Sequence, residues 1–317
     1  MTVAHEAPAS GTKMFSTDDV PWMKLGKLSS DSLTLDEAIH AAGLDFTVSP
    51  QPVMFRRGEE LLTYDGRFVI TRDDTGAPLG VVSDEYTPVQ YSDAFRFMET
   101  INARFVAAGA LNGARQGFVV VKLEGTKLDV FDGQDPHDLF AVLRTSHDRT
   151  RGIEVCVMPL RYRCMNQLTM PSFGSDATLR WSIRHTKSVH DRLAEAEATI
   201  ANVKKYAIVY ADTAQRLASI TLSTASATEI LTKYVLPNYA KKRDDVAQRI
   251  IEMWRTDDRI GAAYSHNGWG LVQAVSTYYD HDRTGGSPQS RFLAAIEGQT
   301  QKAIAKTAGV VLSRYAK

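Results

Sequence analysis

The densest group of residues suited to binding a ligand lies between residues 144 and 192. This segment holds nine Lys or Arg residues against four Asp or Glu residues, and eight of the nine are arginine. Arginine carries a planar fork of donors that binds phosphate oxygens in pairs and stacks on bases. The segment therefore predicts a surface for the phosphate backbone of single-stranded nucleic acid. The predicted contact residues are Arg144, Arg149, Arg151, Arg161, Arg163, Asn166, Arg180, Arg184, His185 and Lys187.

The spacing of these cations places them on sheet faces. Residues 179–184 alternate between apolar and polar side chains, which is typical of a strand with one buried face. Arg180 and Arg184 then share the polar face, and Arg161 and Arg163 share a face of the preceding strand. If the two strands are neighbours, four guanidinium groups line one surface.

A second interpretation of the same arginines stays open. Residues 1–150 carry a net charge of −8 and residues 151–317 a net charge of +8, although the whole chain has 37 basic and 37 acidic residues. The arginines could therefore form ion pairs with the acidic half, either within one chain or between copies. Such a polarised chain also favours head-to-tail assembly of copies.

The tripeptide Ser146-His147-Asp148 contains the residue types of a hydrolytic triad. Consecutive residues of an extended chain point to opposite faces, whereas a triad needs serine against histidine and histidine against aspartate. The pattern favours a turn after the predicted strand 139–144, and no catalytic residue is assigned.

Metal-binding patterns are weak. Seven residues lie between Cys156 and Cys164, which fits no common zinc spacing, and we interpret both as reduced thiols. His185 and His190 are five positions apart across a predicted strand–helix junction, where one helical face would need three or four. We therefore assign no metal site and expect no cofactor.

Composition excludes several classes of protein. Hydrophobic residues make up 44% and charged residues 23%, as in ordinary globular chains. No phosphate-binding loop and no dinucleotide fingerprint is present, which disfavours ATPases and dinucleotide enzymes. There is no secretory signal and no apolar run long enough to span a membrane, so we expect a cytoplasmic protein of a bacterial host cell.

The pattern of elements predicts an α+β fold. A mainly antiparallel sheet packed by a long helix is followed by a helical C-terminal region. We expect a mobile N-terminal arm over residues 1–20, a core domain over 21–224 and the helical region over 225–317. The predicted strands are 68–70, 79–82, 117–123, 139–143, 152–164 and 179–184.

Helix signals are equally specific. Capping boxes predict helix starts at Thr34 and at Ser226, and Ser92 is the expected N-cap of a helix over 93–102. A heptad-like stripe from Val189 to Ala207 predicts a long helix that packs on the sheet, with a self-association seam as the alternative. Helices are also predicted over 241–254, over 269–279 and, after Pro288, over 289–315.

The chain resembles a family of uncharacterised proteins, the domain family number 932, known from actinobacterial phages and mobile elements. The resemblance runs in order over nearly the whole chain and implies a phage or mobile-element origin, without an established activity. It rests on Pro21-Trp22 with Gly26, Gly76 to Val82, Tyr86 to Gln90, Ala108 to Leu111, Thr145 to Asp148, Arg161 with Cys164, Asn166 and Leu168, Ile183 to Thr186, Trp269-Gly270 with Ala274-Val275, and Asp280-His281.

The order of the elements is similar to the sheet-then-helix core of phage single-strand annealing proteins of the RecT, Redβ and Erf kind. That similarity implies rings or filaments that bind DNA in basic grooves. The leading hypothesis is a phage-derived accessory protein that binds single-stranded DNA, self-assembles into a homo-oligomer and anneals single strands in recombination.

Two rival hypotheses remain. One is a metal-dependent hydrolase or nuclease that uses His147, Asp148 and His185. The other is a non-enzymatic host-interaction or assembly factor that binds protein. Divalent-metal-dependent turnover would favour the first, and an apolar interface without any response to nucleic acid would favour the second.

Overall fold

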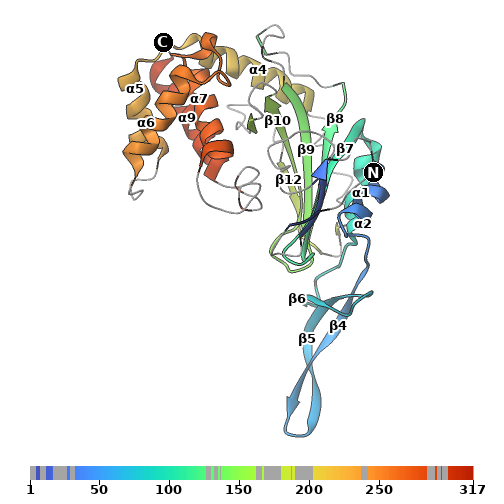
Figure 1. Cartoon of the computed structure of the whole chain (residues 1–317). Helices are drawn as coiled ribbons and strands as arrows, with labels where there is room; N and C mark the ends of the chain where they lie inside the picture. Colours follow the sequence, from blue (N-terminus) through green and yellow to red (C-terminus); the bar gives the residue numbers. More distant parts are fainter. Residues whose placement is uncertain are drawn as a thin grey trace. The chain divides into compact units, whose positions relative to one another are not determined.

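The computed structural model shows the α+β fold that the sequence predicts, with strands in the first part of the chain and helices in the last (Figure 1). Two sheets precede a helical C-terminal region. The structure describes residues 5–7, 12–16, 27–28, 33–125, 130–131, 135, 137–161, 166–167, 180–186, 188–189, 203–236, 242–283, 290, 294 and 299–316.

The chain divides into two compact units, and its path crosses between them several times. Strands β9 (His137–Ser146) and β10 (Ile153–Arg161) each contribute residues to both units. Unit 1 comprises residues 1–125, 140–157 and 179–201, and unit 2 comprises residues 126–139, 158–178 and 202–317.

The larger sheet is mainly antiparallel and has nine strands among the described residues. Its order is β1-β2-β7-β8-β9-β10-β11, with β3 parallel to β2 and β12 antiparallel to β10. All ten residues of β9 are buried, which fits a central strand covered on both faces. The other strands are β1 (His5–Ala7), β2 (Thr12–Ser16), β3 (Lys27–Leu28), β7 (Ala103–Leu111), β8 (Gln116–Leu123), β11 (Asn166–Gln167) and β12 (Arg180–Ile183).

Three of these strands confirm the sequence-based prediction. β8, β9 and β10 occupy the β-prone runs predicted at 117–123, 139–143 and 152–164. β12 confirms the alternation predicted for residues 179–184, because Ile183 is buried while Ser182 and Arg184 are exposed. β1 and β2 lie within residues 1–20, the segment predicted as a mobile arm.

A second, three-stranded sheet has the order β4-β5-β6 and is antiparallel. It consists of β4 (Val48–Arg57), β5 (Glu60–Arg72) and β6 (Pro78–Ser83). β6 pairs only with the second half of β5, so that β4 and the first half of β5 continue as a two-stranded ribbon (Figure 1).

The described part of unit 1 also contains two short α-helices. The capping box predicted at Thr34 is present in α1 (Leu35–Ala41): the Thr34 amide donates to the Glu37 carboxylate at 2.8 Å, and the Glu37 amide donates to the Thr34 hydroxyl at 3.3 Å. The helix predicted over 93–102 starts earlier, as α2 (Tyr91–Arg96), and continues as the 3₁₀ turn η2 (Phe97–Thr100).

Gln90, not Ser92, is the N-cap residue of α2. The Gln90 side chain makes no capping bond and instead accepts from the Val48 amide at 2.9 Å and donates to the Val48 carbonyl at 3.0 Å. The prediction failed because this glutamine bonds to a strand forty-two residues away, which no local pattern reveals.

Unit 2 is largely helical. Its centre is α7 (Gly268–Thr277), whose ten residues are all buried and which contacts α4, α6 and α9. α7 confirms the helix predicted from residue 269 and continues into the π-helical turn η5 (Tyr278–Asp282). The remaining elements are α4 (Val203–Ser219), α5 (Thr224–Glu229), η3 (Ile230–Val235), α6 (Arg243–Thr256), η4 (Ala262–Tyr264) and α9 (Gln299–Tyr315).

The capping box predicted at Ser226 is wrong by three residues. Ser223 is the N-cap of α5, and its hydroxyl accepts from the Ser226 amide at 3.0 Å. Serine is a preferred N-cap residue type at either position, and capping at Ser223 starts the helix three residues earlier than predicted. The predicted helix start at Pro288 and most of the stripe from Val189 to Ala207 lie outside the described residues.

Buried polar side chains join the short segment around residue 135 to the helices of unit 2. The Trp269 indole donates to the Asp135 carboxylate at 3.2 Å, and both side chains are almost fully buried. The Tyr210 ring meets the Trp269 ring edge to face, with 6.0 Å between the centroids. No helix among the described residues is long and apolar enough to cross a membrane.

The contact between β10 and β12 yields a test of the fold. A Cβ atom on Gly152 would lie 2.1 Å from the carbonyl oxygen of Ile183. We expect Gly152→Ala to lower the free energy of unfolding by about 1–3 kcal/mol, because the two backbones must separate. Urea unfolding followed by circular dichroism measures this change. Ser182→Ala, at an exposed site on β12, should change it by less than about 0.5 kcal/mol. Equal stability of Gly152→Ala and the wild type would contradict the close packing.

Candidate functional site

The turn between β9 and β10 is fixed by its own side chains. The Ser146 hydroxyl donates to the Arg151 carbonyl and accepts from the Arg151 amide, both at 3.0 Å. The Asp148 carboxylate accepts from the Thr150 amide at 2.9 Å and also from the Thr150 hydroxyl. Arg149 adopts a φ of 65°, a left-handed conformation that is uncommon for this residue type. The turn therefore presents Arg149, Thr150 and Arg151 in succession at its tip.

Segments from distant parts of unit 1 hold this turn in place. A Cβ on Gly80 of β6 would lie 2.7 Å from the Asp148 Cα, so only glycine allows this approach. The Tyr86 hydroxyl donates to the Ser146 carbonyl at 3.1 Å, and the Thr87 amide donates to the His185 carbonyl at 3.1 Å. Three segments thus meet in one place, namely residues 80–87, 145–152 and 183–186.

These segments enclose a polar cleft with a volume of about 450 Å³, which we call the arginine cleft. This volume lies in the range of small-ligand sites. Its charged rim combines three arginines with two glutamates. The lining residues are Ser83, Glu85, Tyr86, Arg149, Thr150, Arg151, Gly152, Glu154, Ser182, Arg184, His185 and Thr186.

Arg144 lies beside the arginine cleft and pairs with one of its two glutamates. Its side chain is only 10% exposed and forms an ion pair with Glu154 at 2.5 Å, while Arg151 lies 3.7 Å from the same carboxylate. Arg144 therefore neutralises Glu154 instead of facing a ligand. The residues that line the cleft comprise three arginines against Glu85 and Glu154, which leaves one positive charge.

His185 forms the floor beside Tyr86. Its Nε2 atom lies 2.9 Å from the Thr145 hydroxyl, and its ring stacks on the Tyr86 ring with 5.0 Å between centroids. Burial lowers the pKa of His185 to about 4, partly opposed by the Thr87 backbone, so the imidazole is neutral near pH 7. Burial also raises the pKa of Tyr86, with a smaller contribution from the Asp148 charge. A hydroxyl–imidazole pair can activate a nucleophile, but Thr145 is fully buried and closed to substrate. The hydrogen bond between Thr145 and His185 therefore holds the imidazole ring in place at the floor of the cleft.

His147 lies still deeper, behind the turn. It is fully buried, and neither ring nitrogen has a hydrogen-bond partner among the described residues. Its ring packs against Tyr91, with 4.4 Å between centroids, and near Phe46. Burial, reinforced by the nearby His185, lowers the pKa of His147 to about 3, and Asp148 opposes this shift. His147 is therefore held neutral inside the protein.

Ser146, His147 and Asp148 thus serve three different partners. The serine binds Arg151, the histidine packs among aromatic rings, and the aspartate caps Thr150. No group of three or more His, Cys, Asp or Glu side chains in the described part of the chain is placed to hold a metal ion.

The predicted contact residues are distributed unevenly. Arg149, Arg151, Arg184 and His185 line the arginine cleft, and Arg144 lies beside it. Arg161, Asn166 and Arg180 lie in β10, β11 and β12, while Arg163, Lys187 and the candidate metal ligand His190 lie outside the described residues.

Several lining residues escaped the sequence analysis. Glu85 and Tyr86 are about sixty positions upstream of the arginines, and no spacing connects them to the basic segment. Thr150 and Ser182 are common surface residue types that carry no signal alone. Only the resemblance in Tyr86 to Gln90 marked part of this region in advance.

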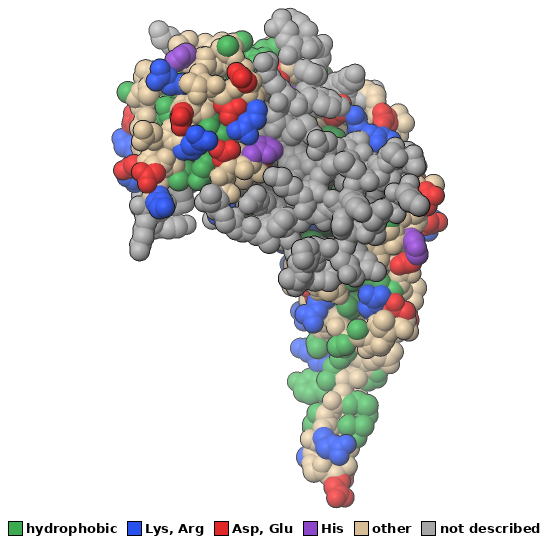
Figure 2. Space-filling model, viewed as in Figure 1, with side chains coloured by type: hydrophobic (Ala, Val, Ile, Leu, Met, Phe, Trp, Pro, Cys, Tyr) green, Lys and Arg blue, Asp and Glu red, His purple; other side chains and the backbone are tan. Residues whose placement is uncertain are grey.

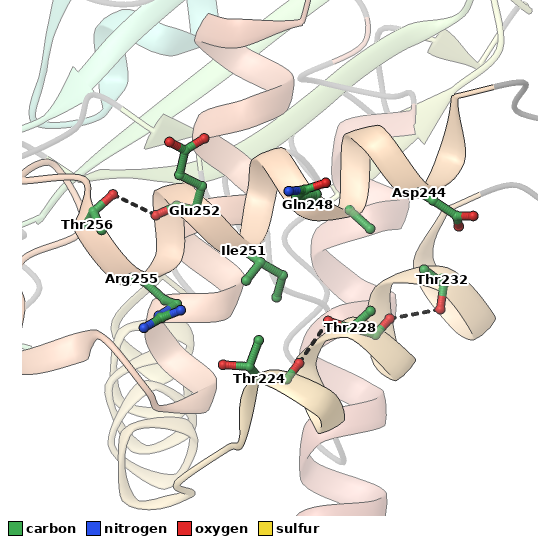
Figure 3. Close-up of a pocket in the computed structure, with 10 residues that line it drawn as sticks. Thr224, Thr228, Thr232, Asp244, Gln248, Ile251, Glu252, Arg255 and Thr256 are labelled. Atoms are coloured by element: carbon green, nitrogen blue, oxygen red, sulfur yellow. Dashed lines mark hydrogen bonds between the residues drawn. The ribbon is translucent and has the colours of Figure 1, made fainter.

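Unit 2 contains a larger groove, between α5–η3 and α6, with a volume of about 780 Å³ (Figure 3). Thr228 and Thr232 donate their hydroxyls to the carbonyls of Thr224 and Thr228, each at 2.8 Å, so these hydroxyls are already satisfied. Ile251 forms part of the apolar lining. Because the groove combines acidic and basic groups at its rim without a clear excess, its chemistry points to no particular ligand.

The comparison with known proteins identifies a family. The chain matches Domain of unknown function (DUF932) over residues 78–310. The match covers well over half of the chain, so the chain belongs to this family. All residues that line the arginine cleft fall within the matched range. No curated protein and no solved structure matches the chain.

The buried histidine predicts a pH dependence of stability. Below about pH 6.5 the unfolded chain protonates His147 while the folded chain keeps it neutral, so stability falls as the pH decreases toward 3. We expect this residue to cost the folded state about 2 kcal/mol between pH 7.5 and pH 5.0. Urea unfolding at both pH values should show a smaller pH effect for His147→Phe than for the wild type.

His266→Asn serves as the control, because this histidine is exposed and asparagine tolerates its φ of 75°. Its pH effect should equal that of the wild type. An undiminished pH effect in His147→Phe would show that His147 is not held neutral by burial.

Proposed function

We propose that this member of the family binds the phosphate backbone of single-stranded nucleic acid in the arginine cleft and assembles with copies of itself. The proposal includes a phage or mobile-element origin and single-strand annealing as the activity. The observation that carries it is the convergence of Arg149, Arg151 and Arg184 on one polar recess. No catalytic step is assigned to the site.

The chemistry of the rim supports an anionic ligand. Guanidinium groups bind phosphate oxygens in pairs, and their charge is retained at every physiological pH. The neighbouring hydroxyls of Ser83 and Ser182 can donate further hydrogen bonds to phosphate or sugar oxygens. Because His185 is neutral near pH 7, the arginines and not the histidine supply the positive charge.

The shape of the recess favours a single strand over a duplex. A concave site of this volume can take one or two nucleotides of a flexible strand, whereas a duplex is stiff over roughly 150 base pairs and cannot bend into it. Aromatic stacking contributes little, because one face of the Tyr86 ring already lies on His185. We therefore expect binding dominated by the backbone, with weak sequence preference.

The arginines of the rim give the direct test. We expect Arg149→Ala/Arg184→Ala to weaken binding of a labelled single-stranded oligonucleotide about tenfold or more at moderate salt, because two phosphate contacts are lost. The slope of log K against log salt should become shallower by about 0.7 for each lost contact. Fluorescence anisotropy over a range of salt concentrations measures both quantities.

The control removes an equally exposed cation elsewhere. Arg216→Ala, on α4 of unit 2, should leave affinity and slope within error of the wild type. If the double variant behaves like this control, the arginine cleft is not the binding surface. Binding by neither variant nor wild type would favour a protein partner, and metal-dependent turnover would favour the hydrolase hypothesis.

A substitution that should strengthen binding gives a second test of the arginine cleft. Glu85 is exposed and lines the same cleft, so Glu85→Gln removes a negative charge without removing bulk. We expect it to strengthen oligonucleotide binding about two- to fivefold at low salt, and the gain should vanish at high salt because the effect is electrostatic. Glu99→Gln, on a partly exposed residue outside the cleft, is the matched control. Unchanged affinity in Glu85→Gln would place the bound phosphates elsewhere.

A further inference from the structure

The part of the β4–β5 hairpin beyond β6, residues 53–65, is the distal ribbon. Its two-residue loop is Gly58-Glu59, closed by the pair Arg57 and Glu60. Gly58 has a φ of 62° whereas Glu59 does not have a positive φ, which is typical of the type II′ turns that favour tight hairpins. Arg57 and Glu60 also form an ion pair at 3.3 Å. The distal ribbon is therefore a regular, specifically closed structure.

Large hydrophobic side chains are exposed on the distal ribbon. Of the six exposed ones among the described residues, four lie here: Met54, Phe55, Leu61 and Tyr64, which are 44–57% exposed. The register pairs Phe55 with Leu62, and the Phe55 and Tyr64 rings meet edge to face with 6.4 Å between centroids. Phe55, Leu62 and Tyr64 thus share one face of the ribbon. Figure 2 shows hydrophobic side chains along this projection, with charged ones near its tip.

No described strand or helix covers this part of the hairpin. β6 pairs with β5 only from Arg67 to Thr71, so the outer edge of residues 60–66 has no strand beside it in the described part of the chain. The outer edge of β4 is blocked near its base, because Pro50 and Pro52 lack amide protons and Val48 is bonded to Gln90. A lone two-stranded ribbon is only marginally stable in water, and exposed apolar groups at this density mark an interaction surface.

We propose that the distal ribbon is a self-association surface, on which the distal ribbon of a second copy of this chain packs about a two-fold axis. This inference rests on the self-assembly part of the proposed function and assigns it a location. It does not depend on the arginine cleft.

The charge pattern favours a second copy over a partner of one charge sign. The distal ribbon carries two positive residues, Arg56 and Arg57, against three negative ones, Glu59, Glu60 and Asp65. Arg57 and Glu60 share the face of Phe55 and Tyr64 and form an ion pair with each other, so that face carries no net charge to repel an identical face in a two-fold arrangement. A surface selected for a strongly acidic or basic partner would carry an excess of one sign, which this ribbon lacks.

The available area predicts a weak association. Two of the four exposed side chains, Phe55 and Tyr64, lie on the shared face and offer roughly 200 Å² of surface in each copy, if about half of each large side chain is accessible. Two copies together bury about 400 Å² through these side chains, which is well below the roughly 1,200 Å² of a stable interface. The open β5 edge can add backbone pairing to this area. We therefore expect a concentration-dependent dimer, not a permanent one.

Sedimentation velocity of the full chain without nucleic acid, over about 1–100 μM, tests the inference. We expect the wild type to shift from monomer toward dimer in this range, as transient interfaces of this size do. Phe55→Thr/Tyr64→Thr keeps strand-forming residues and removes the aromatic face. It should raise the dimer dissociation constant at least tenfold. Ile208→Thr, at a side chain 71% exposed on α4, is the matched control and should leave the dissociation constant unchanged.

Hydrogen exchange of the wild type provides a readout that does not depend on a variant folding. The amides of residues 60–66 should become more protected as the protein concentration rises. A monomer at every concentration overturns this inference and the self-assembly part of the proposed function. An oligomer that the double variant leaves intact, without added protection at 60–66, overturns the inference alone.

Discussion

The close packing of backbone against backbone around the β9–β10 turn is the constraint on which the rest of unit 1 depends. Gly80 and Gly152 let β6 and β12 approach this turn to distances that a methyl group would prevent. The Tyr86 hydroxyl and the Thr87 amide fix the adjoining segment against the same turn and against His185. These contacts bring Arg149, Arg151 and Arg184 to one recess, although β10 and β11 lie between the turn and β12 in the sequence.

Neutral side chains lie buried behind that recess, and charged side chains lie at its rim or in an ion pair. His147 and His185 are buried and neutral, so they place no positive charge in the interior. Arg144 neutralises Glu154 in an ion pair that is largely buried. The positive charges left over belong to the exposed rim, where a ligand can reach them. Burying an unpaired charge is costly, and the charged groups of this region accordingly lie in an ion pair or at the exposed rim.

Local patterns predicted local structure well. The β-prone runs of β8, β9 and β10 and the capping box at Thr34 were correct, because the residues that determine them are adjacent in sequence. Ser226 and Ser92 failed as caps because a nearby serine competed in one case and a tertiary bond of Gln90 intervened in the other. Most of the residues that line the cleft fall within the basic segment 144–192. Which arginines face it could not be predicted, since that depends on strand pairing and on glycine contacts with β6 and β12.

The central claim is that the arginine cleft binds a single strand through its phosphates, and the most direct measurement is the salt dependence of wild-type binding. Fluorescence anisotropy with a labelled single-stranded oligonucleotide and a duplex of equal length, at low and moderate salt, compares the two ligands under the same conditions. The account predicts tighter binding of the single strand and a marked loss of affinity as salt rises. Absence of binding at low salt, or binding that salt does not weaken, would contradict it.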